Sequence, residues 1–282
     1  MTTFTGPDGT RLGYRVLGRG EPLLVLAGGP MRDAAYLGDL GGLGGLSAHR
    51  ALHVLDLRGT GRSERPADPA DHRVDRQVAD VEAFRTHLGL DRVDLLAHSA
   101  GCSLATLYAL RHPERTGRLV LVTPSLRIFG STSSEDDYRE AAEARGLAEQ
   151  EWYPAARAAV RTAFAGGAAD PDAVAPLFHG TWDAAARAHE ADRTAQSHPE
   201  AAAAYHGGGF QPADVRAAVA ELASPALLLA GEYDPDPRPG AVRATAALFR
   251  HARTAVQPAA GHYPWLDDPA AFTRTVAAFL AP

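Results

Sequence analysis

Ser99 stands where an apolar run gives way to small residues. Residues 93–105 read VDLLAHSAGCSLA, with a helix-like pattern after the serine. Such a stretch is typical of a nucleophile elbow, a sharp turn from strand to helix that needs small residues two positions before and after the nucleophile. Ala97 and Gly101 occupy those positions. A serine here can instead cap the following helix, so the elbow needs support from residues elsewhere in the chain.

A serine hydroxyl becomes a good nucleophile when a histidine takes its proton and a carboxylate orients that histidine. After a nucleophile elbow, the acid and then the histidine follow along the chain. Asp234 directly follows the apolar run 225–231, and His262 follows a further expected strand in the stretch QPAAGHYPWLDDP. The order therefore predicts a triad of Ser99, Asp234 and His262, with Asp236 as the reserve acid.

Acyl transfer through a serine also needs two N–H donors for the negative charge that develops on the carbonyl oxygen. One usually belongs to the residue after the nucleophile, which is Ala100 here. The other belongs to a loop after an early strand, where the chain reads LAGGPM. We expect Gly29 to supply it, because Pro30 has no N–H. The alternative for Gly28 and Gly29 is a simple tight turn.

Strands that alternate with helices would place these loops at one edge of a sheet. Three apolar runs, at 22–29, 93–99 and 225–234, predict strands buried on both faces. Further strands are expected at 11–17, 51–57, 118–123 and 252–257, with helices at 75–88, 103–111 and 241–250. Turn signals near the N-terminus favour an antiparallel hairpin there. The pattern predicts an α/β fold with a mostly parallel eight-stranded sheet.

Residues 127–223 differ in character from the rest of the chain. Runs of β-branched residues disappear, and Ala, Glu, Arg, Trp and His recur at helical spacings. We interpret this segment as a helical lid inserted after the sixth strand, between core segments 1–126 and 224–282. Ligands of open α/β folds bind at the sheet edge that such a lid would cover. Six residues are expected to line a small-molecule pocket there: Pro30, His98, Trp152, Phe178, Trp182 and Tyr263.

The composition excludes several classes of function. All 28 basic residues are arginine, which excludes enzymes that depend on a Schiff-base or P-loop lysine. Cys102 is the single cysteine, so no four-cysteine zinc site or iron-sulfur cluster can form. The net charge of −6 carries no basic stripe, which argues against nucleic acid as a partner. No signal peptide or membrane-spanning run is visible, so we expect a cytoplasmic protein. A serine triad needs no cofactor, and we expect none. The oligomeric state stays open.

Several motifs together resemble those of the α/β-hydrolases, and within that fold those of the proline iminopeptidase and related esterase group. Besides the elbow, they are DLRGTGRS at 56–63, GEYDP at 231–235 and AGHYPWLDDP at 260–269. The resemblance covers nearly all of the chain outside the lid. It implies the same fold and the same triad.

The chain departs from the iminopeptidase pattern near the expected oxyanion donors. Ala27 and Met31 replace a histidine and a glycine of the oxyanion loop, and His98 and Ala100 replace a glycine and a tryptophan beside the serine. Peptidase members of the group bind a free amino terminus through lid carboxylates. Three acidic lid residues are present, but none aligns with that role: Glu190, Asp192 and Glu200.

The sequence therefore predicts a serine hydrolase that cleaves a small or medium ester or amide through an acyl-enzyme. A proline iminopeptidase and an acyltransferase or thioesterase of specialised metabolism use the same triad and stay open. A ligand-binding, receptor-like protein that retains the pocket is the alternative outside enzymes. Epoxide hydrolases and haloalkane dehalogenases need a carboxylate where Ser99 stands, which argues against them.

Overall fold

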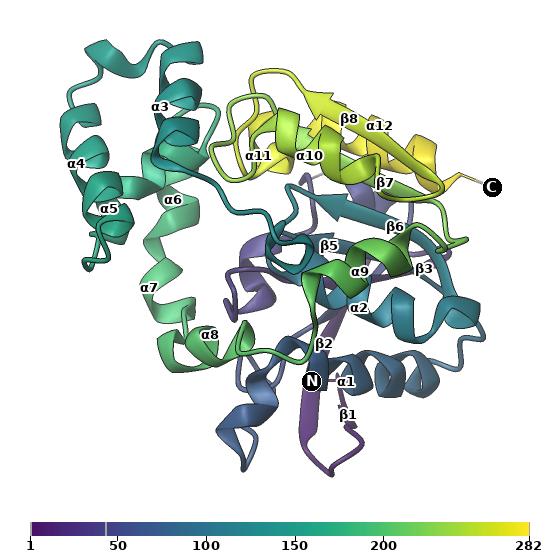
Figure 1. The fold of residues 1–282 in the computed structure, drawn as a ribbon. Coiled ribbons are helices and arrows are strands. Elements are labelled where there is room, and N and C mark those ends of the chain that lie inside the picture. The colour runs from purple at the N-terminus through teal and green to yellow at the C-terminus, as the bar shows by residue number, and fades with distance from the viewer. Residues whose placement is uncertain (1, 43, 282) are drawn as a thin grey trace.

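The computed structural model describes residues 2–42 and 44–281 and contains one eight-stranded sheet (Figure 1). The strand order is β1-β2-β4-β3-β5-β6-β7-β8. The strands are β1 (Thr2–Thr5), β2 (Arg11–Leu17), β3 (Pro22–Leu26), β4 (Ala51–Leu55), β5 (Val93–His98), β6 (Thr116–Val122), β7 (Ala226–Gly231) and β8 (Ala252–Gln257). Strands β1 and β2 form the expected antiparallel hairpin, and the strands from β4 to β8 in this order pair in parallel. The predicted mostly parallel sheet is confirmed.

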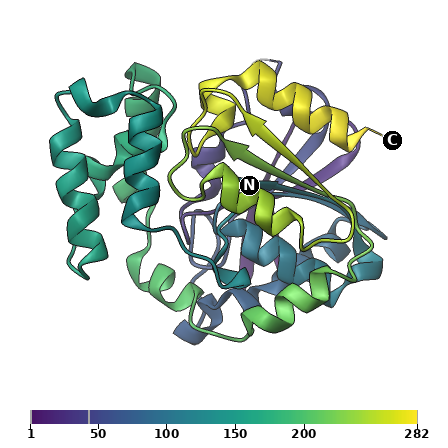
Figure 2. The same cartoon turned by 45° about the horizontal axis from the view of Figure 1, so that its top comes forward.

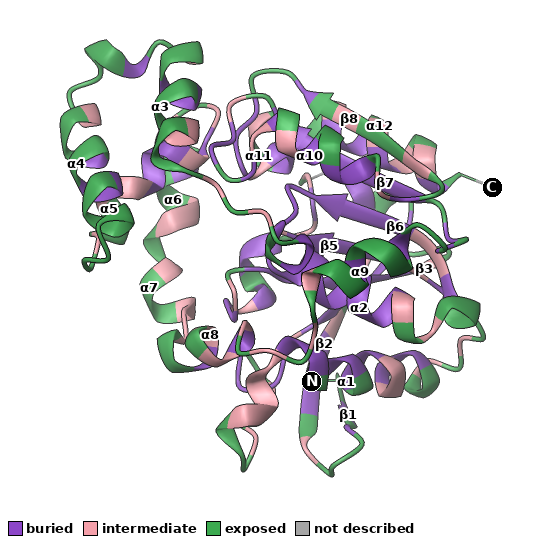
Figure 3. Ribbon diagram, in the orientation of Figure 1, coloured by how far each residue is buried: buried purple, intermediate pink, exposed green. Residues whose placement is uncertain are grey.

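Helices cover both faces of the sheet, which explains the continuous apolar strands. In β3, Leu24 and Leu26 belong to one buried cluster, whereas Leu23 and Val25 belong to the other. The first cluster includes residues of α1 (Val74–His87), α2 (Gly101–Arg111), α9 (Pro212–Val219) and α10 (Pro239–Ala246). The second includes residues of α11 (Pro264–Asp267) and α12 (Pro269–Leu280). Figure 3 shows the resulting burial of the central strands.

The helical insertion after β6 is also confirmed, and its first helices stand to one side of the sheet (Figure 2). Its helices before α9 are α3 (Glu135–Ala144), α4 (Tyr153–Phe164), α5 (Pro171–Val174), α6 (Ala184–Ala191), α7 (Arg193–Gln196) and α8 (Pro199–Tyr205). The first part has its own small cluster, which includes Ala156 and Leu177. By contrast, Tyr205 of α8 and Val215 of α9 join the main core. The exact lid boundaries, 127–223, stay a prediction.

Two expected helices start or end elsewhere than predicted. The helix expected at 241–250 spans 239–246, because Pro239 fits the first helical turn, where no intrahelical N–H bond is lost. The helix expected at 103–111 begins at Gly101, directly behind the serine. None of the helices in residues 2–42 and 44–281 has the length and apolarity needed to cross a bilayer.

Candidate active site

Ser99 occupies the tight turn between β5 and α2. Its φ of 52° lies in the left-handed region, which is uncommon for a residue with a side chain and holds the hydroxyl away from the helix. The turn requires glycine at position 101, because a Cβ there would overlap the carbonyl oxygen of Ala27 and lie 2.8 Å from that of Leu26. Strand β3 therefore packs directly against the start of α2.

Neighbouring elements hold this turn through its backbone. The N–H of Ser99 donates to the carbonyl of Val122 at 2.9 Å, and the Ser99 carbonyl accepts from the N–H of Ser125 at 3.1 Å. The hydroxyl of Tyr205, at the end of α8, donates to the carbonyl of Ala100 at 3.0 Å. Strand β6 and the insertion thus both fix the position of the serine.

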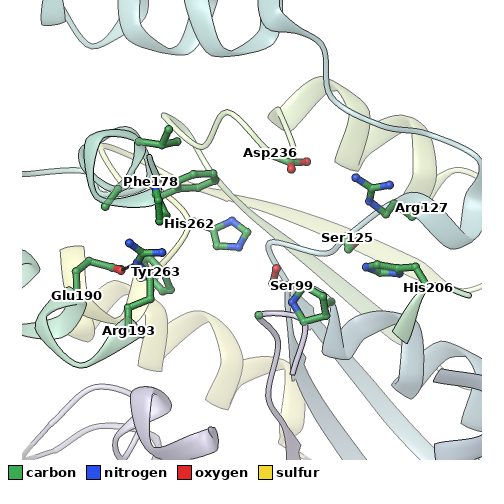
Figure 4. Close-up of a pocket in the computed structure, with 16 residues that line it drawn as sticks. Ser99, Ser125, Arg127, Phe178, Glu190, Arg193, His206, Asp236, His262 and Tyr263 are labelled. Carbon is green, nitrogen blue, oxygen red and sulfur yellow. Dashed lines mark ion pairs between the residues drawn. The ribbon is translucent and has the colours of Figure 1, made fainter. Parts of the chain in front are cut away.

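His262 and Asp234 form a buried pair at the same edge of the sheet. His262 Nδ1 lies 2.8 Å from Asp234 Oδ2, which leaves Nε2 for another partner. The second oxygen, Oδ1, accepts the N–H of Asp236 at 3.0 Å. Asp236 itself accepts a bond from the Ser133 hydroxyl and does not contact the imidazole in this way. Figure 4 shows the Ser99 hydroxyl projecting into the pocket beside the imidazole of His262.

Burial and charge act in opposite directions on this pair. Burial lowers the pKa of His262, but the Asp234 carboxylate outweighs it and raises that pKa above the ordinary histidine value. Burial raises the pKa of Asp234, and the neighbouring His262 opposes that shift. A histidine held this way is a base whose conjugate acid is stabilised by a fixed carboxylate.

The loop after β3 lies against the serine turn. A Cβ at Gly28 would lie 2.6 Å from the carbonyl oxygen of His98 and 2.8 Å from Ser99 Cβ, so only glycine fits. The N–H of Gly28 donates to the Tyr36 hydroxyl at 2.8 Å, whereas Gly29 lines the pocket together with Ser99. Gly29 has φ of 120°, which favours glycine, and precedes Pro30 through a cis peptide bond. Among the described residues, the Gly29 N–H makes no hydrogen bond.

A cavity of about 390 Å³ opens above Ser99. Its lining residues are Gly29, Pro30, Ser99, Ala100, Ser125, Arg127, Pro171, Val174, Ala175, Phe178, Glu190, Arg193, His206, Asp236, His262 and Tyr263. Three of the six residues expected at the pocket wall, Pro30, Phe178 and Tyr263, are among them. Aliphatic and aromatic lid residues form one part of the wall, charged or polar groups another, and Gly29, Pro30 and Ala100 line it beside Ser99 (Figure 4).

The other three expected wall residues lie elsewhere. His98 is buried beneath the pocket, where its ring bonds to Tyr36 and to the backbone of His262. Trp152 packs against the lid's own apolar cluster. Trp182 lies beside His179, at 5.4 Å between ring centroids, and under the guanidinium of Arg187. The spacing of apolar residues in the sequence did not distinguish the inside of the lid from the pocket wall.

Glu190 is the lid acid that lines the pocket, and two arginines and a histidine surround it. Its carboxylate lies 3.1 Å from His179 Nε2, 2.9 Å from Arg193 Nε and 3.9 Å from Arg32 Nη1. Burial raises the pKa of Glu190, but His179, Arg32 and His189 outweigh it and lower that pKa. The other two lid acids considered, Asp192 and Glu200, are exposed and outside this lining.

The lid is joined to the loop that carries His262. The N–H of His262 donates to the carbonyl of Phe178 at 2.7 Å. The half-buried Asp267 carboxylate accepts from the N–H groups of Gly180 at 2.9 Å and Gly261 at 2.8 Å. Two hydrogen bonds therefore join the lid segment to the segment around His262, and the Gly261 bond to Asp267 braces that segment internally.

Several residues of the site escaped the sequence-based expectations. Ser125, Arg127, Arg193 and His206 line the pocket although no motif contains them. The hydroxyl of Tyr36 was not foreseen either, because its partners lie far away in the chain. Among the described residues, no group of three or more His, Cys, Asp or Glu side chains is arranged to hold a metal ion.

A family model described as alpha/beta hydrolase fold matches residues 21–269. Because this match covers most of the chain, the chain belongs to the alpha/beta hydrolase family and is a hydrolase of that family. This finding agrees with the resemblance suggested by the motifs.

Individual relatives share either a short stretch of sequence or the whole fold. A (lyso)-N-acylphosphatidylethanolamine lipase of Mus musculus is 46% identical over 79 residues, which are 27% of this chain and 23% of the lipase. The chain thus matches about a quarter of that relative's length. A thermophilic esterase of Thermogutta terrifontis superposes with a TM-score of 0.73 at 21% identity over 99% of this chain and 97% of the esterase. A proline iminopeptidase of Mycobacterium smegmatis gives 0.72 at 25% identity, with the same coverage.

Proposed function

We propose that this chain is a serine hydrolase that cleaves small or medium carboxylic esters through an acyl-enzyme. The observation that carries the proposal is the 2.8 Å contact between His262 and Asp234, with His262 and Ser99 lining one cavity. The volume of about 390 Å³ suits a small substrate. The proposed reaction needs no cofactor.

In the first half of this reaction, His262 Nε2 takes the proton of the Ser99 hydroxyl as Oγ bonds to the ester carbonyl carbon. The carbonyl oxygen becomes negative and accepts bonds from the N–H groups of Gly29 and Ala100. When the tetrahedral intermediate collapses, the bond to the alcohol oxygen breaks, and protonated His262 gives its proton to that oxygen. The acyl group stays on Ser99.

In the second half, a water molecule gives a proton to His262 as its oxygen bonds to the acyl carbon. The same two N–H groups again stabilise the oxyanion. The bond to Ser99 Oγ then breaks, and His262 returns the proton to the serine. The acid leaves and the starting state is restored. Asp234 stays ionised and keeps the imidazole in one tautomer throughout.

A proline iminopeptidase is the second candidate, because a lid carboxylate does reach the pocket at Glu190. The similarity to the iminopeptidase of Mycobacterium smegmatis points the same way. However, Arg193 and His179 already occupy the carboxylate. A substrate amine would have to compete with these two side chains for the carboxylate, so we favour the ester.

Initial rates with p-nitrophenyl butyrate and proline p-nitroanilide test the two candidates, with Ser99→Ala as the blank. We expect hydrolysis of the ester and little of the anilide. Glu190→Gln tests whether the carboxylate binds a substrate amine, since it removes the negative charge and keeps the side-chain shape. Preference for the anilide, together with its loss in Glu190→Gln, would favour the iminopeptidase.

If neither substrate is turned over above the Ser99→Ala blank, hydrolysis of simple esters and prolyl amides is ruled out. Acyl transfer to another acceptor, thioester cleavage or simple ligand binding would then take its place. A pre-steady-state burst followed by slow release, which an added acyl acceptor then accelerates, would indicate the acyltransferase, because the acyl-enzyme waits for its acceptor.

A further inference from the structure

A chain of buried hydrogen bonds runs beneath Ser99, between the oxyanion loop and the base loop. The N–H of Gly28 donates to the Tyr36 hydroxyl at 2.8 Å. That hydroxyl lies 2.6 Å from His98 Nδ1, and His98 Nε2 lies 3.0 Å from the carbonyl oxygen of His262. Tyr36 comes from the short helix η1 (Ala34–Leu37), and His98 is the last residue of β5. Tyr36 and His98 thus connect the loop of Gly28 to the loop of His262, which are far apart in sequence.

The chemistry of the groups determines the direction of every bond in this chain. A carbonyl oxygen only accepts, so His98 must carry its proton on Nε2. Nδ1 is then an acceptor, and the Tyr36 hydroxyl must donate to it. The hydroxyl oxygen in turn accepts from Gly28. Burial, reinforced by the nearby His262, keeps the pKa of His98 well below its usual value, which agrees with a neutral ring.

Packing and a second donor hold the same carbonyl. The rings of His98 and His262 are 4.7 Å apart between centroids, and the Thr123 hydroxyl donates to the His262 carbonyl at 2.9 Å. His98 is 2% exposed and Tyr36 6% exposed, so water does not compete freely for these bonds. The His262 backbone is therefore fixed from below, while Asp234 orients its ring.

We propose that Tyr36 and His98 are positioning residues that hold the oxyanion donor and the catalytic base in register with Ser99. The bond from the Gly28 N–H to Tyr36 anchors the oxyanion loop one peptide before the Gly29 N–H. The Gly28 carbonyl, in the same peptide as that N–H, accepts from the N–H of Arg32 at 3.1 Å. The bond from His98 to the His262 carbonyl fixes the position of the His262 backbone relative to Ser99. This inference rests on the proposed roles of Ser99, Gly29 and His262. It assigns His98, expected at the pocket wall, a role beneath it.

Tyr36→Phe is the most direct test, because it removes one hydroxyl and keeps the ring that fills the space. Loss of a whole oxyanion donor lowers the rate by about 100-fold to 1,000-fold, so a donor that is only misdirected should cost about tenfold. We expect a fall of about tenfold in kcat for p-nitrophenyl butyrate with nearly unchanged KM. The rate at which a fluorophosphonate labels Ser99 should fall similarly, since labelling needs the same serine, base and oxyanion donors.

His98→Gln and the double variant test the connection itself. If the two side chains act as one chain, the double variant should be no slower than the slower single variant. Tyr108→Phe is the matched control: it also removes a buried tyrosine hydroxyl, which donates to Glu82 away from the site. We expect this control to retain full kcat and labelling rate. Melting temperatures of all variants measure any general loss of stability.

Three results separate this inference from the proposed function. If Tyr36→Phe labels and turns over like Tyr108→Phe, or if the two single effects multiply in the double variant, the positioning role is wrong while hydrolysis stands. If the wild-type protein is labelled at Ser99 but hydrolyses no ester, and labelling falls in Tyr36→Phe, the positioning role stands while hydrolysis is wrong. If the wild-type Ser99 is not labelled at all, both are wrong.

Discussion

Two aspartates two positions apart in the chain have different surroundings. Asp234 is fully buried and lies 2.8 Å from His262, whereas Asp236 bonds to the hydroxyl of Ser133 on the lid side. A carboxylate orients a catalytic imidazole only when it contacts the ring nitrogen opposite the nucleophile. The geometry therefore favours Asp234 as the acid over the reserve acid Asp236.

Alanine substitutions should separate the two aspartates by activity. Ser99→Ala, His262→Ala and Asp234→Ala are each expected to lower kcat by more than about 1,000-fold, because triad members act as a unit. Asp236→Ala should cost less than about tenfold, since it leaves the pair intact. Rates with p-nitrophenyl butyrate compare the activities of the four variants, and circular dichroism spectra show whether each variant is folded. Equal losses at the two aspartates would contradict this assignment.

The pH dependence of the rate should report the state of His262. The base works only when it is deprotonated, and Asp234 raises its pKa above the usual value of about 6.5. We therefore expect kcat/KM to fall on the acid side with a midpoint above about 6.5. Asp234→Asn removes the charge and should move this midpoint to lower pH, whereas the exposed Asp91→Asn should leave it in place. An unchanged midpoint in Asp234→Asn would show that another group titrates.

At the scale of elements, the site depends on how closely β3, β5 and α2 approach one another. Only residues without a Cβ fit at positions 28 and 101, where the oxyanion loop meets the serine turn and β3 meets α2. The lid adds a further element, since Phe178 and Gly180 bond to the His262 loop and to Asp267. Strand, helix and lid thus all meet within a few residues of Ser99.

Gly101→Ala should lower both stability and activity. The added methyl would overlap the backbone of β3, and overpacking of this kind costs about 1–3 kcal/mol of unfolding free energy. Gly240→Ala is the matched control, because that glycine lies in α10 with open space around its Cβ position. We expect this control to stabilise the protein slightly, by about 0.5–1 kcal/mol, and to keep full activity. Urea denaturation measures the free energies; a neutral Gly101→Ala would show that β3 and α2 can move apart.

At the scale of the whole molecule, two apolar clusters lie on the faces of the sheet and a smaller one lies in the lid. Between the lid and the core, Glu190, His179 and His189 form a mostly buried polar group with Arg32. Such groups make the stability of the fold sensitive to pH, because their protonation differs between folded and unfolded states.

The free energy of unfolding should fall as the pH decreases from about 6.5 to about 4. Burial, and then the nearby Arg32, lower the pKa of His189 to about 4, so the unfolded chain binds this proton first. Between about pH 6.5 and about pH 4, acid therefore favours the unfolded chain, and this one group lowers the free energy of unfolding by up to about 3 kcal/mol. Urea denaturation at several pH values measures the slope. His189→Gln should make it shallower, whereas His251→Gln, on the exposed surface, should not; equal slopes in wild type and His189→Gln would contradict the assignment.

The local pattern was sufficient to predict the sheet, the insertion after β6 and the order of the candidate triad. Period and composition report on single elements, and Ser99, Asp234 and His262 each directly follow or lie near the end of a strand. In a mainly parallel sheet such ends meet at one edge, so the chain order predicts that the three residues lie close together. The pocket wall was predicted less well, because the spacing of apolar residues in the lid does not show which side of a helix faces the pocket. Trp152 packs against the lid's own cluster, whereas Phe178 lines the pocket.

Through its residue types and their order, the sequence by itself determined the fold class, the family and the candidate serine, histidine and acid. The tertiary structure alone decided that Asp234 rather than Asp236 contacts His262, and that Glu190 reaches the pocket among cations. It alone also placed His98 below the serine instead of at the pocket wall. These facts depend on distances between segments far apart in the chain, such as 164 positions from His98 to His262. No local pattern encodes such distances, because packing of the whole chain sets them.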